Sequence, residues 1–376
     1  MRVLVVDTYY PAFLVAHYAA RKGLDAKPYD EQLDSLLGQS FGTSDAYSRN
    51  LRALGHDAIE IVVNSEPLQR AWAAERGFSP SPATRLRRLL PGRLEGRAAL
   101  REIALAQIDE FGPDVVYLQD LWFFSTNELK ELRSKGSLVV GQIASAPPPD
   151  ARLRAFDLLT TSFPHYVERF RALGVDAEFF PIAFDEVVLD RLRDRGLSSD
   201  PASARPYALT FVGGLDPRLH GRGVHLLESI ASELELAVWG YGAEGLAQRS
   251  PLRRWYRGHA WGLDMYEVLA SSRITLNRHI KAAEGHANNM RLYEATGMGA
   301  MLATDAATNL GALFQPGREV VSYHTVDDLV KSLRRYEADE DARREVAAAG
   351  YRRTISEHTY SRRIPELAAM LESRLR

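Results

Sequence analysis

The sequence contains no cysteine. A disulfide, a thiolate nucleophile and a cysteine-ligated metal site are therefore all excluded. A strong net charge is also missing, since 47 Lys and Arg stand against 49 Asp and Glu, which leaves −2 at pH 7. Without a positive field the chain has no general attraction for nucleic acid, so we expect no nucleic-acid partner.

Long apolar runs are absent as well. No run reaches the roughly 20 residues of a membrane helix, so there is no predicted transmembrane segment and any membrane contact is expected to be peripheral. The first apolar segment, residues 2–7, begins with Arg2 and ends on Asp7. That pattern is typical of a β-strand and not of a signal peptide, so we expect a cytoplasmic protein.

The length and composition favour two folded domains. A chain of 376 residues with 45% hydrophobic and 26% charged residues can bury more than one core. The polar, Pro- and Arg-rich stretch after residue 185 marks a linker. The sequence predicts an N-terminal domain over 1–185, a linker over 186–206, a C-terminal domain over 207–357, and a helix over 358–376 that packs back on the first domain.

Short apolar segments typical of buried parallel strands recur in both halves. They are 2–7, 59–64, 114–120, 137–143 and 157–162, then 208–214, 236–242, 274–279 and 300–305. Predicted helices separate them, at 45–54, 84–110, 127–135, 165–173, 224–234, 265–271 and 289–296. This alternation predicts an α/β protein with two doubly wound, Rossmann-like domains. Such domains bind small molecules where the loops at the carboxyl ends of parallel strands converge, so we expect a cleft between two facing domains.

One such loop, residues 213–223, combines glycine and arginine. Gly213 and Gly214 would let backbone amides approach an anion, and Arg218 and Arg222 stand near the start of the next helix. The loop therefore predicts a phosphate or diphosphate site, although a flexible turn with solvated arginines is the alternative. Lys281 is a third cation for the same phosphates, and it has the same alternative.

A second group lies at the start of a predicted helix. Arg291 and Glu294 are three residues apart and share a helix face close to Asn288. The Glu294 carboxylate can accept hydrogen bonds from two hydroxyls, as acidic residues do from the ribose of a dinucleotide. An exposed Arg–Glu pair is the alternative interpretation.

From about residue 208 onward the sequence resembles a known family. The resemblance rests on FVGG, WGYG, GLDMYEVLASSRITLNRH, NMRLYEATGMGAMLATD, LFQPGREVVSY and EHTYSRR, and it points to the CgeB-like glycosyltransferases, which are related to the retaining GT-B group. It implies a GT-B fold and sugar transfer to a hydroxyl of a small molecule or glycan. The implied donor is a nucleotide sugar such as a UDP-, GDP- or TDP-sugar, used without metal or other cofactor and with retention.

The resemblance also implies roles for individual residues. Glu294 would bind the donor ribose, Arg222 or Arg218 the diphosphate, and the residues around Tyr241 and 259–261 the base. Retaining relatives often carry a second glutamate eight positions before the first, but that position is His286 here. His286 is therefore a candidate catalytic residue, and the group that contacts the sugar stays open.

In the N-terminal half, candidate catalytic residues follow apparent strands. Asp120 comes directly after the segment VVYLQ, and His165 starts a helix. A histidine titrates near neutrality and could act as a base, but single histidines are more often structural. Asp7 and the segment 40–45, with its hydroxyls and a helix start, are further candidates for holding an acceptor. Thr43 and Ser44 are the expected N-cap residues of that helix.

Other features and functions compete with this interpretation. Asp339 and Asp341 resemble a metal-binding Asp-x-Asp, but acids favour a helix start, which is how we interpret them. Arginines over 85–101 are expected to form a solvated face. A nucleotide-sugar epimerase or hydrolase could use the same fold. A non-catalytic, two-lobed sugar-binding protein is a rival from another class.

Overall fold

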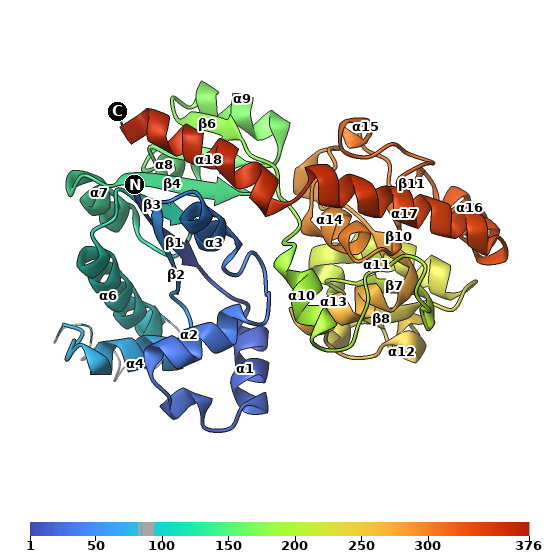
Figure 1. The fold of residues 1–376 in the computed structure, drawn as a ribbon, viewed down its shortest axis with the longest axis horizontal. Coiled ribbons are helices and arrows are strands. Elements are labelled where there is room, and N and C mark those ends of the chain that lie inside the picture. The colour runs from blue at the N-terminus through green and yellow to red at the C-terminus, as the bar shows by residue number, and fades with distance from the viewer. Residues whose placement is uncertain (82–83, 85–93, 376) are drawn as a thin grey trace. The chain divides into compact units, whose positions relative to one another are not determined.

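The computed structural model describes residues 1–81, 84 and 94–375, which form two compact units (Figure 1). The first unit comprises Met1–Pro181 together with Arg363–Arg376, and the second comprises Ile182–Arg362. The stretch 186–206, expected to be a linker, is grouped with the second unit and contains the helix α10 (Val187–Arg193).

The first unit is built on a parallel six-stranded sheet. Its strands are β1 (Arg2–Asp7), β2 (Asp57–Val62), β3 (Val115–Leu118), β4 (Leu138–Ile143), β5 (Leu158–Thr161) and β6 (Asp176–Phe179). They lie in the order β2-β1-β3-β4-β5-β6. Because β2 lies on one side of β1 and β3 on the other, the strand order reverses at β1 and β3. Small molecules bind at this switch point in open α/β sheets, outside the carboxyl ends of the strands.

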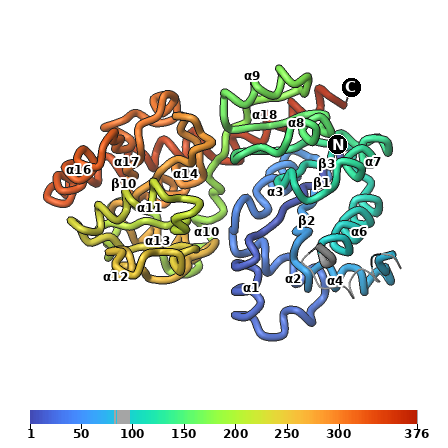
Figure 2. Tube along the Cα trace, turned by 180° about the vertical axis from the view of Figure 1, so that it is seen from behind, coloured from blue at the N-terminus to red at the C-terminus, as the bar shows by residue number. Residues whose placement is uncertain are grey.

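Helices surround this sheet. They are α1 (Pro11–Ala20), η1 (Leu24–Ala26), α2 (Tyr29–Leu37), α3 (Ala46–Ala53), α4 (Glu66–Glu75), α6 (Leu94–Phe111), α7 (Thr126–Ser134), α8 (Asp150–Leu153), α9 (Pro164–Ala172) and most of α18 (Tyr360–Leu375). Figures 1 and 2 show α2, α4 and α6 beside one another. The end of α18 is fixed to β6, because Arg374 forms ion pairs of 2.6 Å with Asp176 and 2.9 Å with Glu178.

Several local predictions for this unit need correction. Thr43 and Ser44 do not cap α3, since the helix begins after Asp45, and Ser44 instead donates its hydroxyl to the Leu37 carbonyl at 2.6 Å. The strand predicted at 59–64 lies two residues earlier. Helices α1 and α4 were not expected. In α1, apolar residues occupy almost every position, which hides the helical period. Of the helix predicted over 84–110, residues 85–93 lie outside the described residues.

The second unit repeats the plan with five parallel strands. They are β7 (Tyr207–Val212), β8 (Ala237–Trp239), β9 (Ser272–Asn277), β10 (Met301–Asp305) and β11 (Val321–Tyr323), in the order β11-β10-β9-β7-β8. The switch point of this sheet lies between β7 and β9. Apolar side chains from β7, β9 and β10 fill the core, with Leu209, Ile274 and Met301 at most 2% exposed.

The helices of the second unit follow its strands. Besides α10 they are α11 (Pro217–Ala231), η2 (Ala243–Gly245), α12 (Leu252–Trp255), α13 (Leu263–Ala270), η3 (Lys281–Ala283), α14 (Met290–Gly297), α15 (Leu310–Leu313), α16 (Val326–Ala338) and α17 (Glu340–Glu357). Asp339 accepts a hydrogen bond from the Ala342 amide and caps α17, which confirms that the acids at 339–341 mark a helix start.

Candidate functional site

The switch point of the second unit gathers several of the predicted residues. Gly213 and Gly214 directly follow β7, and Arg278 and His279 directly follow β9. Strands β7 and β9 are hydrogen-bonded neighbours, so these two loops leave the same edge of the sheet side by side. Their position is the one where α/β sheets bind ligands.

The glycines of the first loop allow backbone to lie against backbone. A Cβ atom on Gly240 would lie 1.7 Å from the Gly213 carbonyl oxygen, and one on Gly214 would lie 2.4 Å from Nε2 of His220. The Leu215 amide donates to the Tyr241 carbonyl at 2.8 Å. The loop after β7 therefore lies directly against the loop after β8.

Arg278 lies beside this loop, and sequence reasoning missed it. Its Nη1 is 3.4 Å from the His220 carbonyl, and a Cβ on Gly223 would lie only 1.4 Å from that nitrogen. The side chain is half-buried, and it forms no ion pair with any carboxylate in the described part of the chain. The segment 274–279 was interpreted as strand to its end, whereas β9 stops at Asn277. A cation at the first position after a strand was the available signal.

The three cations predicted from the sequence, Arg218, Arg222 and Lys281, are more exposed than Arg278. Arg218 pairs with Asp216, the N-cap residue of α11, at 2.7 Å and leaves 82% of its side chain exposed. Hydrogen bonds from Arg218 lower the pKa of Asp216 to about 2. Arg222 and Lys281 are exposed on α11 and η3. Arg218 is thus already neutralised by a neighbouring carboxylate.

Aromatic rings lie next to the glycine loop. Tyr241 stacks on Trp261 with 5.8 Å between ring centroids and 13° between planes. His259 lies 5.6 Å from Trp261, and His220 lies 6.3 Å from Tyr241. The fold therefore brings together the residues that the family resemblance assigns to a nucleotide base.

Arg291 and Glu294 form a buried pair on α14. Their side chains are 14% and 6% exposed and lie 2.7 Å apart. Arg291 also donates to the Val212 carbonyl at the end of β7, at 3.2 Å, and Tyr266 donates to the second oxygen of Glu294 at 3.4 Å. Burial raises the pKa of Glu294, while the Arg291 charge opposes that rise. The exposed-pair alternative does not hold.

A polar network joins the ends of β9 and β10. Asn289 caps α14 and donates to Asn277 at 2.8 Å, and Asn277 donates to Thr304 at 3.0 Å. The His279 amide donates to Asp305 at 3.0 Å. The predicted residues of the adjoining loop are also placed: Asn288 is buried, and Nδ1 of His286 is 3.2 Å from the Ala283 carbonyl.

In the first unit, Asp7 and Asp120 meet at the switch point between β1 and β3. The Thr8 hydroxyl donates to Asp120 at 3.1 Å, and the Thr8 amide donates to Asp7 at 2.7 Å. Burial, with a smaller contribution from the charge of Asp120, raises the pKa of Asp7 to about 7. A carboxyl group that titrates near neutrality can exchange a proton with a hydroxyl.

His165 does not join this pair. It lies on the first turn of α9, after β5, and the strand β4 separates β5 from β3, so these two strands are roughly 10 Å apart. Its ring lies 5.5 Å from Phe163 and 4.6 Å from Tyr166. Sequence reasoning grouped His165 with Asp120, but the fold separates them along the sheet edge.

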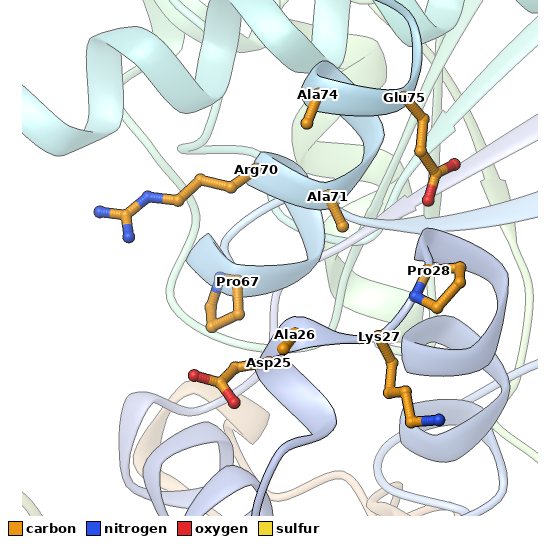
Figure 3. Close-up of a pocket in the computed structure, with 9 residues that line it drawn as sticks. All are labelled: Asp25, Ala26, Lys27, Pro28, Pro67, Arg70, Ala71, Ala74 and Glu75. Atoms are coloured by element: carbon orange, nitrogen blue, oxygen red, sulfur yellow. The ribbon is translucent and has the colours of Figure 1, made fainter.

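A cavity of about 500 Å³ lies between η1 and the side of α4 (Figure 3). Figure 3 shows Arg70 extending away from the other residues that line it. Three of its charged groups are engaged by neighbours: Lys27 pairs with Glu31, Arg70 with Glu66, and Glu75 accepts the Tyr29 amide. This cavity lacks the convergent polar groups of the two switch points.

Among residues 1–81, 84 and 94–375, no group of three or more His, Cys, Asp or Glu side chains could hold a metal ion. No helix in the described part of the chain has the length and apolar character needed to cross a membrane.

Comparisons with known proteins agree with this architecture. The model of the family described as "Glycosyl transferase-like" matches residues 222–369. No curated protein sequence matches the chain significantly.

Solved structures match over the whole chain. HepE of Anabaena, solved in complex with UDP-glucose, has a TM-score of 0.61 at 12% identity and covers 99% of this chain and 100% of its own. Sucrose-phosphate synthase of Thermosynechococcus elongatus has a TM-score of 0.58 at 13% sequence identity, and the match covers 99% of each chain. AviGT4, a glycosyltransferase involved in avilamycin A biosynthesis, has a TM-score of 0.56 at 16% sequence identity. The match covers 100% of this chain and 98% of the AviGT4 chain. The chain therefore has the GT-B fold of glycosyltransferases, with a glycosyltransferase-like domain over residues 222–369.

Proposed function

We propose that the protein is a glycosyltransferase that moves a sugar from a nucleoside diphosphate to a hydroxyl of a small molecule or glycan. The observation that carries this proposal is Arg278, a half-buried cation without a carboxylate partner among the described residues, beside the glycine loop at the β7–β9 switch point. An unneutralised guanidinium in such a position suits a diphosphate, because it offers charge and several donors.

The surroundings of Arg278 suit the rest of a nucleotide. The stacked rings of Tyr241 and Trp261 offer a surface for a base. Glu294 has lone pairs left for ribose hydroxyls. Asn288 and His286 lie in the segment that leads into α14. HepE was solved with UDP-glucose, so we propose UDP as the first nucleotide to test.

We further propose that transfer is metal-independent and retaining, as expected of CgeB-like relatives. Arg278, assisted by Arg222 and Lys281, would supply the positive charge that the departing diphosphate requires. In the first unit, Asp7 and Asp120 would orient the acceptor hydroxyl. His165 lies farther along the edge and is a weaker candidate for the base.

Product analysis tests this function against its rivals. The protein is incubated with UDP-glucose, alone and with a panel of sugar and polyol acceptors, and products are separated and analysed by NMR. Transfer predicts a new glycoside with the anomeric configuration of the donor, and little turnover of donor alone. Rapid acceptor-independent conversion would instead indicate a hydrolase or epimerase, and sugar binding without any nucleotide dependence would indicate a binding protein.

A further inference from the structure

One aromatic side chain of the first unit stands apart from its neighbours. In the segment 121–124, Leu121, Phe123 and Phe124 are each 1% exposed, but Trp122 is 51% exposed. The segment directly follows β3 and Asp120, at the switch point of the sheet. Single exposed apolar side chains are common on protein surfaces, but this ring lies at the sheet edge where α/β folds bind small molecules, so it is available to a ligand there.

Hydrogen bonds to the backbone hold Trp122 in this position. Its amide donates to Oδ1 of Asp120 at 2.7 Å, and its carbonyl accepts from Arg97 at 2.8 Å. Arg152 donates to the carbonyls of Leu121 and Phe124. Both arginines thus brace the segment, and Trp122 is presented on a fixed backbone instead of a mobile tip.

Two polar side chains lie beside Trp122, one at its ring and the other at its backbone amide. The Arg152 guanidinium lies 5.9 Å from the Trp122 ring centroid. Asp120 uses one lone pair of each carboxylate oxygen, for the Trp122 amide and the Thr8 hydroxyl. A carboxylate offers about four such positions, so Asp120 can accept further hydrogen bonds from a ligand.

This juxtaposition selects one kind of ligand. A pyranose has an apolar face of C–H groups and a rim of hydroxyls, so it can lie on an aromatic ring while its hydroxyls donate to a carboxylate. A lipid chain would need a wide apolar surface, but the other large side chains of the segment are buried. We propose that Trp122 and Asp120 form a sugar-binding subsite, with the ring stacking on a pyranose of the acceptor.

That the bound sugar is an acceptor rests on the proposed function. The inference adds that the acceptor is a carbohydrate. Trp122 would be a binding residue, and Asp120 would fix the orientation of a sugar hydroxyl. The subsite uses side chains of the first unit alone, so its binding of a sugar can be measured without a nucleotide.

Saturation-transfer NMR on the full chain tests the subsite, with the methyl glycosides of glucose, galactose, mannose and N-acetylglucosamine as probes. At least one should receive saturation on its ring hydrogens. Trp122→Ala should reduce this signal by about tenfold, and Trp122→Phe, which keeps an aromatic face, by about twofold. Trp255→Phe is the matched control. Trp255 also lies against an arginine, with the Arg254 guanidinium 4.6 Å from its ring centroid, but it belongs to α12 of the second unit. It should leave the signal unchanged.

Each outcome has a separate meaning. The subsite is overturned if none of the four glycosides receives saturation, or if the signal is equal in wild type and Trp122→Ala. If the protein instead self-associates with rising concentration and Trp122→Ala abolishes this, Trp122 belongs to a protein interface. UDP titration of the same variants distinguishes the two proposals. If wild type binds UDP but no glycoside, the subsite fails while the proposed function stands. If it binds a glycoside through Trp122 but no nucleotide, the reverse holds.

Discussion

Arg278 and Arg218 carry the same charge in different surroundings, which separates their expected roles. Arg218 is neutralised by Asp216 and largely exposed, whereas Arg278 is half-buried and has no carboxylate partner among the described residues. Arg278→Gln should therefore weaken UDP binding by about 10- to 100-fold, the worth of a charge-assisted hydrogen bond. Arg218→Gln is the control and should change the affinity less than about twofold. Equal losses in the two variants, measured by calorimetric titration, would contradict the assignment.

Asp7 makes the stability of the protein depend on pH. Its folded-state pKa of about 7 lies above the unfolded value of 3.8, so the folded state holds the proton more tightly. The contribution to stability is complete below about pH 4 and is lost as the pH rises through 7.

The variant Asp7→Asn removes this pH dependence but still accepts the Thr8 amide. Its stability relative to wild type should therefore be more favourable at pH 8 than at pH 5, by about 2 kcal/mol. Urea unfolding at both pH values measures this difference. A difference that is independent of pH would show that Asp7 titrates normally.

Replacing Glu294 should lower the stability of the protein as well as its affinity for a nucleotide. Glu294→Ala leaves Arg291 buried without its partner, so the free energy of unfolding should fall by about 3 kcal/mol. Glu294→Gln keeps the size and one acceptor, and should lose roughly half of that. Nucleotide affinity is best compared in the Gln variant, where an unchanged affinity for UDP would argue against ribose binding. Urea titration of both variants checks the order of stability.

At the scale of the element, α11 contains a matched pair of glycines. An added Cβ on Gly223 would collide with the Arg278 guanidinium, but one on Gly221 would meet nothing within 4 Å. Both substitutions to Ala favour the helix by up to about 1 kcal/mol. Gly223→Ala should displace Arg278 and weaken UDP binding by about tenfold, as loss of a charge-assisted hydrogen bond would, whereas Gly221→Ala should leave binding unchanged.

Combining the change with Arg278→Gln provides a further check. If Gly223 acts through Arg278, the double variant should bind UDP no more weakly than Arg278→Gln alone. Additive losses would show that Gly223 acts on the loop itself. Calorimetric titration of the four proteins completes the cycle.

Elements with a clear hydrophobic pattern could be predicted, and their exact ends could not. Residues 2–7 are apolar and β-branched and form β1 as expected, because a strand buried on both faces leaves a continuous apolar run. Arg278 was missed as a binding residue because the apolar strand pattern runs two residues past Asn277, where β9 ends. Ser44 was taken for a cap because its type suits one, whereas its φ of 47° places it in a left-handed turn before the helix. Such turns depend on contacts outside the local helix pattern, such as the one with Leu37 seven residues earlier.

At the scale of the whole molecule, two doubly wound sheets were predictable because the strand–helix alternation occurs twice. The donor-side residues were also partly predictable, since glycine, arginine and glutamate cluster in two short segments of the second unit. The acceptor side was not. Asp7 and Asp120 come from strands more than a hundred residues apart, and only the order β1-β3 makes them neighbours. The exposure of Trp122 depends on Arg97 and Arg152, which no local pattern reveals.

Calorimetric titration of the protein with UDP, GDP, TDP and ADP tests the central claim most directly. The second unit is expected to bind at least one nucleoside diphosphate with about micromolar affinity, and that binding should be lost in Arg278→Gln. Absence of binding to all four nucleotides by the folded wild-type protein would contradict the assignment of the β7–β9 switch point as a nucleotide-sugar site.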